Sequence, residues 1–561
     1  MTAEGIGPLV PSIIVGLWGV LCLLASRAGL PPWLARAVPA SGLVLALAAA
    51  IAEFMAVDLV GGRLADGALI VDKLAALIDV VVVAALGVPV VVAPQAGPRA
   101  PWARGMLLLA GAGAMLAARA GDWPTPLVGL ELAALATGLC MAASGEEAGE
   151  AGERAGRAAG RGWLLGQAVG AAILWLGIGL VVAATGTVKL HELGARIGSV
   201  FLRWGASTAQ AAVDVLQGPE ALPPGLIAHA RDAAVEGMAP AALLIPGVLL
   251  VLAGLLARAG VWPLLAGRVA AAGRAELTGF VAAELVLRTA AIAALIRVFV
   301  GVLHAPRVVY APYGWGSAAT VIGGVSALAC AIAAVRAADV KRLLAWAGAA
   351  QAGLAVLAIA AAANFVAHAG LRSGGLQLEV HYTWGHGAGE AAVAAALAGQ
   401  VVFTLGALGV LACAAAVQAG RGTVDFAGLG RRSPWLAGGL AVCLLALIGA
   451  PPTAGFPARW MWMTAVLEDS NPLVRAMLAA GTLAWALLGW ALLRVLATAL
   501  GPGDGGQPRR GATAVTLVVA GALLWTGLIG HGLWSMAEEA SAGVAFQAGG
   551  KGRVEWMSRR R

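Results

Sequence analysis

Apolar positions run along most of the 561-residue chain in long stretches with few charges. Many stretches exceed the roughly 20 residues that a helix needs to cross a bilayer. They predict an all-α polytopic membrane protein. About 14 transmembrane helices are expected, at residues 9–26, 37–57, 68–93, 103–119, 124–144, 163–185, 238–263, 278–302, 316–337, 341–363, 389–418, 434–457, 472–499 and 511–534. In the long connection after residue 185, the stretch VKLHELGARIGSVFLRW (188–204) fits an amphipathic surface helix.

The composition supports this class and excludes several soluble ones. The chain is 60% hydrophobic and 12% charged, with a mean hydropathy of +0.87. No Walker loop or dinucleotide fingerprint is found. The five cysteines lie in apolar runs without a Cys-x-x-Cys pair, so we expect small buried side chains rather than metal ligands. His381 and His386 have no third partner, which argues against a metal site.

The basic residues predict the orientation in the membrane. Seventeen lysines and arginines, among them Arg104 and Arg268, lie in loops after odd-numbered helices, and five, among them Arg119, lie in the short loops after even-numbered helices. The first set is therefore expected in the cytoplasm, with both termini outside. The basic residues after position 550 oppose this rule.

Two predicted helices contain breaks. RAGVWPLLAGR (258–268) and GAPPTAGFPARW (449–460) each combine proline, glycine and arginine. They lie five helices apart and so run in opposite directions, as paired broken helices do in the inverted halves of many transporters. Proline removes a backbone hydrogen bond, and the freed carbonyls can solvate a cation. We expect a polar niche at each break.

Charges inside a membrane helix are costly and need a partner or water. Eleven fall within or next to the predicted helices: Glu53, Asp72, Lys73, Asp79, Glu131, Arg258, Glu284, Arg288, Arg297, Glu390 and Arg459. Glu53, Lys73, Arg297 and Glu390 fit side chains anchored at the membrane interfaces. Glu284 and Arg288 can pair locally at i,i+4. Glu131 lies deeper, which favours either proton handling or an ion pair with a basic partner.

Several motifs resemble those of one family, the antiporter-like membrane subunits of respiratory complex I (NADH–quinone oxidoreductase), and among them most closely subunit N. VGLELAALATG (128–138) is similar to the family's fifth helix with its essential glutamate. The stretch 160–190, with its Ala-Thr-Gly-Thr exit, resembles the sixth helix. DVKRLLAWAG (339–348) resembles the Asp-x-Lys-Arg-Leu-Leu-Ala-Tyr segment, and GAPPTAGF (449–456) the twelfth-helix motif.

The resemblance implies a fold of 14 helices with two inverted five-helix repeats and broken helices 7 and 12. It implies an N-terminal three-helix block over 1–100, repeats over 101–302 and 303–500, and a final helix with a basic tail over 501–561. It further implies a role in coupling quinone reduction to proton movement.

The resemblance also implies the setting of the chain. FMN, iron–sulfur clusters, NADH and quinone would belong to the complex, with none bound by this chain. Its partners would be other membrane subunits of complex I and the lipid bilayer, with no nucleic acid. The location would be a bacterial inner membrane.

The same resemblance assigns the site residues one by one. Glu131 matches the fifth-helix glutamate, while Arg258, Arg288 and Arg459 stand where the family has lysines in helices 7, 8 and 12. Only 4 lysines accompany 33 arginines in the whole chain. A buried lysine can release its proton, whereas arginine stays charged. The family's Pro-Phe-His-x-Trp-x-Pro-Asp stretch is missing, and Gln351 stands where helix 10 commonly has histidine.

Three functions fit these observations. The first is a proton-translocating subunit N in which Glu131 exchanges the proton and the arginines act as fixed cations. The second is a structural, non-pumping subunit of the same complex, which the three arginines favour. The third is a subunit of a multi-part cation/proton antiporter or of a membrane hydrogenase, since these share the fold.

Overall fold

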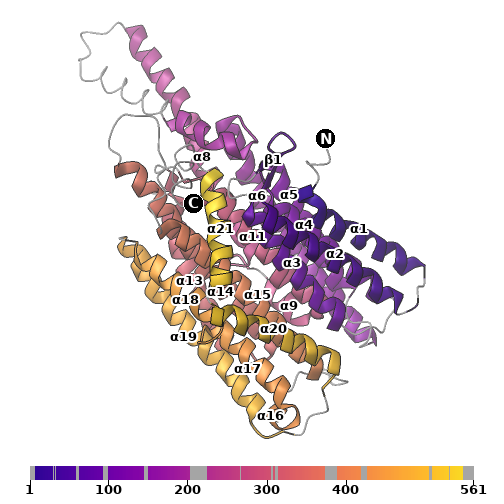
Figure 1. Ribbon diagram of the computed structural model, residues 1–561. Helices are drawn as coiled ribbons and strands as arrows, with labels where there is room; N and C mark the ends of the chain where they lie inside the picture. Colours follow the sequence, from indigo (N-terminus) through magenta and orange to yellow (C-terminus); the bar gives the residue numbers. More distant parts are fainter. Residues whose placement is uncertain are drawn as a thin grey trace.

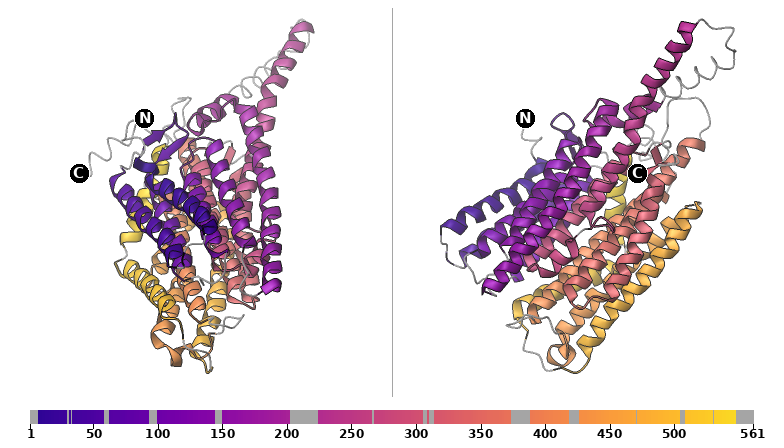
Figure 2. Two further views of the ribbon diagram at one scale, coloured as in Figure 1. Left: turned by 90° about the vertical axis from the view of Figure 1, so that its right-hand side faces the viewer. Right: turned by 180° about the vertical axis from the view of Figure 1, so that it is seen from behind.

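The computed structural model describes residues 7–28, 31, 33–57, 62–92, 99–143, 149–201, 224–265, 267–304, 308–309, 314–372, 388–417, 426–469, 471–503, 508–529 and 531–547. Within these residues 13 helices are long and apolar enough to cross a membrane. α17 (Pro434–Ile448) and α18 (Gly455–Leu467) together cover the remaining predicted span. The prediction of an all-α polytopic fold with broken helices 7 and 12 is confirmed. Figures 1 and 2 show that the long helices run roughly along one direction.

The N-terminal block combines three helices with a β-hairpin. Its elements are η2 (Gly7–Leu9), α1 (Val10–Arg27), α2 (Leu34–Ala56), the antiparallel strands β1 (Gly62–Leu64) and β2 (Leu69–Val71), and α3 (Lys73–Val92). α3 is buried over most of its length because α2, α4, α15, α20 and α21 pack against it. The predicted helix 68–93 begins too early, since residues 69–71 pair with β1.

The first repeat ends in an irregular helix. Its elements are α4 (Ala100–Ala118), α5 (Pro124–Ala142), α6 (Gly149–Thr185), α8 (Pro224–Ala259), α9 (Arg268–Arg274), α10 (Leu277–Phe280), the π-helical η4 (Val281–Leu287), α11 (Arg288–Leu295) and the π-helical η5 (Ile296–Val300). α6 begins well before the predicted residue 163, because ion pairs one turn apart, such as Glu150–Arg154, stabilise its exposed first turns.

The predicted amphipathic helix after α6 is confirmed over its described part. Residues 190–201 are helical. Leu190, Leu193, Ile197 and Val200 are buried at helical spacing, while most of the intervening positions are exposed or half-buried.

The second repeat is followed by two C-terminal helices. The elements are α13 (Trp315–Val335), α14 (Val340–Arg372), α15 (Ala388–Val417), α16 (Leu429–Arg432), α17, α18, α19 (Pro472–Leu500), α20 (Arg510–Ile529) and α21 (His531–Gln547). The predicted last helix, 511–534, is wrong at its end. The apolar run stops at Ile529, and α21 is a separate helix with polar residues such as Ser535 and Glu538 that packs against α3 and α15.

Each repeat contains a helix crossing at which two glycines face each other. Between α4 and α5, a Cβ added to either Gly113 or Gly129 would lie 2.6 Å from the carbonyl oxygen of the other. Between α13 and α14, a Cβ on Gly323 or Gly353 would lie 2.9 or 2.7 Å from the other's carbonyl oxygen. Only glycine permits so close an approach of two helices. This shared crossing supports the correspondence of the two repeats, while the residues at which the blocks divide stay a prediction.

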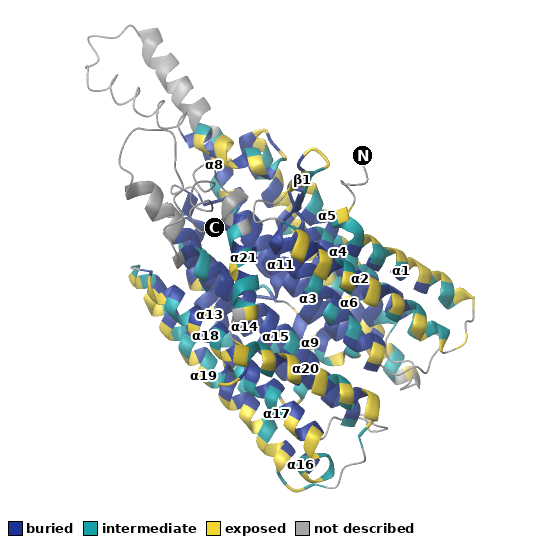
Figure 3. Cartoon of the chain, viewed as in Figure 1, coloured by how far each residue is buried: buried dark blue, intermediate teal, exposed yellow. Residues whose placement is uncertain are grey.

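Burial separates an interior from a lipid-type exterior. α3, α11, α14 and α15 are largely dark blue in Figure 3, whereas α1, α2, α19 and α20 carry exposed residues on their outer sides. The exposed positions include large apolar side chains such as Trp490 in α19 and Trp525 in α20. Such faces suit contact with acyl chains, as expected of a membrane protein.

Three arginines that we assigned to loops are buried instead. Arg104, Arg119 and Arg268 are 2%, 0% and 3% exposed, because each folds inward from the end of a helix. Without them, the predicted loop charges fall from seventeen to fifteen on one side and from five to four on the other. The predicted orientation is therefore unchanged, and it stays a prediction.

Candidate functional site

Helix 7 breaks between α8 and α9. α8 ends at Ala259, and Gly260 follows with a φ of 73°, the left-handed conformation that ends many helices. The last carbonyls of α8 then accept side-chain donors. The Arg258 carbonyl oxygen accepts from Arg268 Nη1 (2.6 Å) and the Ala259 carbonyl oxygen from Arg288 Nε (3.0 Å). The break therefore solvates two guanidinium groups, as predicted for a polar niche.

The guanidinium of Arg258 joins α8 to α5 and α6. Its Nη2 donates to Glu131 Oε1, and its Nη1 donates to Gln167 Oε1 at 2.9 Å. The Arg258 side chain is fully buried, whereas the Glu131 side chain is 28% exposed. Arg258 is thus the basic partner that we expected if Glu131 forms an ion pair. One side of the Glu131 carboxylate stays open. Proton exchange at Glu131 stays a prediction.

A second carboxylate lies between two arginines on the other side of the break. Glu284, in the π-helical segment η4, accepts from Arg268 Nε (2.8 Å) and from Arg288 Nη2. The predicted local pair of Glu284 with Arg288 is confirmed. Arg268 also lies 5.0 Å from the ring centroid of Trp163, a cation–π contact. One buried carboxylate is therefore shared by two cations.

Sequence reasoning missed Arg268 because we counted it as a loop charge. A signal was present, since this arginine follows a proline- and glycine-containing break just as Arg459 follows the second one. The structure strengthens the parallel. A Cβ on Gly260 would lie 2.9 Å from Arg268 Nε, and a Cβ on Gly449 would lie 2.5 Å from Arg459 Cγ. Each break therefore has a left-handed glycine against which an arginine packs.

The break in helix 12 differs in how its arginine is satisfied. Arg459, in α18, is 8% exposed and has no hydrogen-bond or ion-pair partner among the described residues. It lines a small cavity with Gly399, Val402, Phe403, Ala446 and Leu447. The carbonyl of Ile448 at the break accepts from Trp485 Nε1 instead. The predicted solvation of Arg459 by freed carbonyls is therefore wrong, since no carbonyl among the described residues accepts a hydrogen bond from this arginine.

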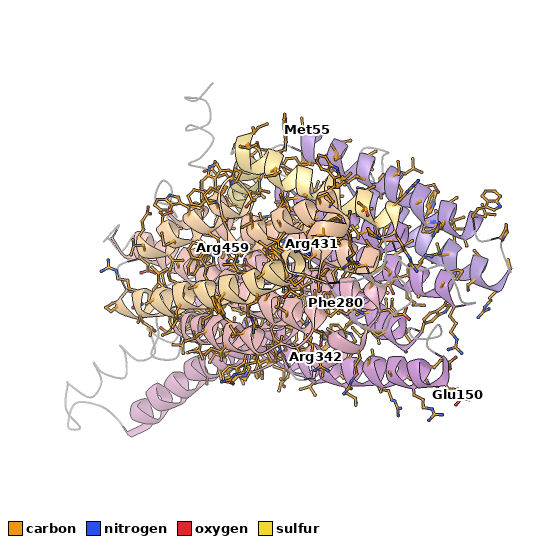
Figure 4. The ribbon with its side chains drawn as sticks, turned by 90° about the horizontal axis from the view of Figure 1, so that it is seen from below. Met55, Glu150, Phe280, Arg342, Arg431 and Arg459 are labelled. Carbon is orange, nitrogen blue, oxygen red and sulfur yellow. The ribbon has the colours of Figure 1, made fainter. Side chains whose placement is uncertain are left out.

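The tenth and eleventh membrane helices, α14 and α15, separate Arg459 from Glu284 and its two arginines. A Cβ on Gly348 would lie 1.8 Å from Arg288 Nη1 and 3.0 Å from Phe403 Cε1, and Phe403 also lines the cavity of Arg459. Gln351 is buried and packs closely on Gly399. Figure 4 shows Arg459 among the helices of the second repeat. We call the series Glu131, Arg258, Arg268, Glu284, Arg288 and Arg459 the arginine line.

A separate group of buried charges lies in the N-terminal block. Arg119, at the end of α4, donates from Nη1 and Nη2 to the two carboxylate oxygens of Glu53 in α2, at 2.8 and 2.9 Å. Its Nη2 also donates to Asp79 Oδ2 in α3. We call these three residues the N-terminal charge cluster.

Most residues expected to anchor at the membrane interfaces are buried and paired instead. Glu53 and Arg297 are 7% and 2% exposed, and Arg297 forms a two-bond ion pair with Asp72 at 2.9 and 3.0 Å. Lys73 is 8% exposed, donates to the Phe54 carbonyl and lies 3.3 Å from Glu539 Oε2. The anchoring prediction is wrong for these three because partners from other helices surround them. Glu390 is half-buried in the first turn of α15.

The loops above the N-terminal block carry an exposed ion pair. Lys189 Nζ lies 2.6 Å from Asp66 Oδ2. The hydrogen bond with Lys189 and the positive charge of its ammonium lower the pKa of Asp66. The same hydrogen bond and the negative charge of the Asp66 carboxylate raise the pKa of Lys189. Partial burial and the nearby Arg63 lower the pKa of His191, which packs against the hairpin at Gly67.

The described residues contain no group of three or more His, Cys, Asp or Glu side chains that could hold a metal ion. All five cysteines are free and buried, as predicted. His381 and His386 lie outside the described residues.

Sequence comparison finds relatives over much of the chain. The family model "NADH:quinone oxidoreductase/Mrp antiporter, TM" matches residues 381–484. NADH-quinone oxidoreductase subunit N of Desulforamulus reducens is 25% identical over 64% of this chain and 61% of its own length. Subunit N 1 of Solidesulfovibrio magneticus is 28% identical over 82% of this chain and 81% of its own. The predicted resemblance to subunit N is confirmed. The match to the Desulforamulus protein spans less than two thirds of that relative.

Solved structures share the fold. A chain of respiratory complex I from Thermus thermophilus with bound aureothin superimposes with a TM-score of 0.67 at 18% identity, covering 94% of this chain and 98% of that one. A chain of the Mrp complex from Dietzia sp. gives 0.72 at 18% identity, covering 98% and 99%. At this identity the likeness establishes the antiporter-like fold of membrane subunits and no more.

Proposed function

We propose that this chain is the subunit N of a proton-translocating NADH–quinone oxidoreductase, which couples quinone reduction to proton movement across the membrane. The observation that carries the proposal is the arginine line. The line begins at Glu131, a partly exposed carboxylate in α5, and continues with arginines bound to the last carbonyls of α8, where helix 7 breaks. Beyond α14 and α15 lies Arg459, next to the break in helix 12. Paired broken helices of this kind mark ion pathways in transporters.

Within the line we assign proton exchange to Glu131. It has an open side, and a carboxylate can gain and lose a proton. Arg258, Arg288 and Arg459 act as fixed cations, because arginine stays protonated in proteins. Arg258 holds the Glu131 carboxylate in place through its hydrogen bond. In this proposal the arginines tune the proton affinity of Glu131 and organise water, and none of them carries the proton.

The redox chemistry belongs elsewhere in the proposed complex. FMN, iron–sulfur clusters, NADH and quinone would be held by other subunits, and this chain would contribute to an oxidoreductase without a redox centre of its own. Its partners would be other membrane subunits of complex I within a bacterial inner membrane. The apolar outer faces of the spanning helices support contact with lipid and with such subunits.

A pull-down of the tagged chain in mild detergent tests the assignment. We expect flavin and iron–sulfur subunits to co-purify, with NADH oxidation by an artificial electron acceptor. Recovery of the chain alone, or with antiporter or hydrogenase subunits and without NADH activity, would overturn the assignment to subunit N.

A second function, that of a non-pumping structural subunit, is favoured by one observation. Glu284 is held by two arginines, and all four basic residues of the line are arginines, which stay protonated in proteins. This candidate predicts fewer protons per electron pair than in a relative with lysines. A third candidate, a subunit of a cation/proton antiporter or membrane hydrogenase, is supported by the fold shared with the Mrp complex.

A further inference from the structure

The N-terminal charge cluster lies away from the arginine line, where α2, α3 and α4 meet. Arg119 directly follows α4, and its carbonyl accepts from the Ile70 N–H of the hairpin. The cluster therefore lies at the end of the helices that the hairpin covers. The side chains of Arg119 and Asp79 are 0% exposed and that of Glu53 is 4% exposed.

The contacts within the cluster distinguish its two carboxylates. Both oxygens of Glu53 accept from Arg119, each from a different nitrogen, which is the fork geometry that stabilises an ionised carboxylate. Asp79 accepts through Oδ2 alone. Its other oxygen, Oδ1, is fully buried and has no hydrogen-bond partner among the described residues. A bare, buried carboxylate oxygen is costly when it carries negative charge.

The charge count points the same way. Two carboxylates share one guanidinium, so the fully ionised cluster has a net charge of −1. A net charge without a counterion is strongly disfavoured in a membrane-embedded interior. One proton on Asp79 would make the cluster neutral while leaving the two-bond pair of Glu53 with Arg119 intact.

The surroundings do not supply the missing positive charge. Arg297 donates to the Ala118 carbonyl, next to Arg119 in the chain, and is paired with Asp72. Lys73 donates to the Phe54 carbonyl, next to Glu53, and is paired with Glu539. η4 and α11 also pack against α3, and their Glu284 and Arg288 pair with each other and with Arg268. α15, α20 and α21 also pack against α3. Glu390 and Arg510 lie in the first turns of α15 and α20, and the charged residues Glu538 and Glu539 of α21 are acidic.

We propose that the N-terminal charge cluster is a proton-binding site, with one exchangeable proton held on Asp79. The proton joins a carboxylate oxygen of Asp79 on binding and leaves from it on release, and no other bond changes. This inference does not depend on the identity of the complex, because it follows from the burial and charge balance of three residues. It gives the chain a titratable group in addition to Glu131, at a place where carboxylates outnumber arginines.

Infrared difference spectroscopy on the purified full-length protein tests the site. A protonated carboxyl group gives a C=O stretching band that is separate from the bands of ionised carboxylates. We expect the wild type near neutral pH to show such a band, to shift it in D₂O because the proton exchanges, and to shift it again when aspartate is labelled with ¹³C at the carboxyl carbon. The labelling identifies an aspartate without any substitution, so it does not depend on the folding of a variant.

Two variants and a control complete the test. Asp79→Asn and Glu53→Gln each leave one carboxylate for one arginine, so both are expected to lose the whole of this band. Asp66→Asn, which changes an exposed carboxylate above the same block, is expected to keep it. Absence of the band in the wild type, absence of the ¹³C shift, or persistence of the band in either cluster variant would overturn the proposal.

Discussion

The arginine line and the N-terminal charge cluster are both buried, yet their charges are balanced in opposite ways. In the line, four arginines accompany two carboxylates, and Arg459 has no partner among the described residues. In the cluster, two carboxylates share Arg119. A surplus of arginine favours the ionised form of a nearby carboxylate at rest, whereas a surplus of carboxylate favours a proton bound at rest. The two regions therefore differ in the protonation state that they favour at rest, although their residue types are the same.

This difference predicts which single changes each region tolerates. In each region, a residue with the less abundant charge forms ion pairs with two residues of the opposite charge. Removal of a residue with the more abundant charge should therefore be tolerated better. Breaking a buried ion pair by removing one partner typically costs about 3–5 kcal/mol, because a buried charge is left uncompensated. Removing a surplus charge leaves no such group behind.

The largest effect is expected from removal of the scarce charge. Arg119→Gln leaves Glu53 and Asp79 without a cation, and Glu284→Gln leaves Arg268 and Arg288 without an anion. Each should lower the free energy of unfolding by about 3–5 kcal/mol, measured by SDS titration of the protein in mixed micelles. Arg154→Gln, in an exposed pair, is the control and should change little.

A smaller effect is expected from removal of the surplus charge. Arg268→Gln leaves Glu284 paired with Arg288, and Asp79→Asn leaves Glu53 paired with Arg119. Each should cost about 1–2 kcal/mol through lost hydrogen bonds. The same titration measures it. If these variants were as unstable as those that lack the scarce charge, charge balance would not be what distinguishes the two regions.

A third change tests whether the arginines of the line are fixed. Replacement of Arg258, Arg288 and Arg459 together by lysine introduces cations that can lose a proton. If Glu131 alone exchanges protons, the ratio of protons to electron pairs should equal that of the wild type, since the charge pattern of the resting protein is kept. A clear rise in this ratio would favour the non-pumping candidate for the wild type.

The smallest effect is expected at the surface pair above the cluster. The pKa of Asp66 is lowered by Lys189, so the pair stabilises the fold above the unfolded-state pKa of aspartate, and this contribution is lost as pH falls through the lower, folded-state pKa. Asp66→Asn should remove only this weak pH dependence at the acidic end, as followed by melting temperature. A large loss of stability at neutral pH would show that the hairpin contact matters more than an exposed ion pair should.

The fold could be predicted largely from the sequence because hydropathy and proline carry strong local signals. Runs of apolar residues located the spans, and the prolines and glycines near residues 260 and 450 located both broken helices. The hairpin at 62–71 was missed because its strands have only three residues each. The division between α20 and α21 was missed because apolar residues, Leu533 and Trp534, resume directly after the short interruption at 530–532.

The candidate site could be predicted only in part. Glu131, Arg258, Arg288 and Arg459 were predicted as charges within membrane helices, and the family resemblance assigned their roles. Spacing could not have joined Glu131 to Arg258, which lie 127 positions apart. Arg268 and Arg119 were missed because an arginine at a helix end can reach water or fold inward, and only the positions of carboxylates on other helices decide which. Glu53 and Asp79 were treated as separate charges, because the sequence does not show that both contact Arg119.

The most direct test of the account is the number of protons moved per electron pair by the complex containing Glu131→Gln, reconstituted in vesicles. This carboxylate is the one member of the arginine line that has an open side and can exchange a proton. We predict a ratio below that of the wild type, with NADH oxidation by an artificial acceptor unchanged. An unchanged ratio with unchanged turnover would contradict a role of Glu131 in proton translocation.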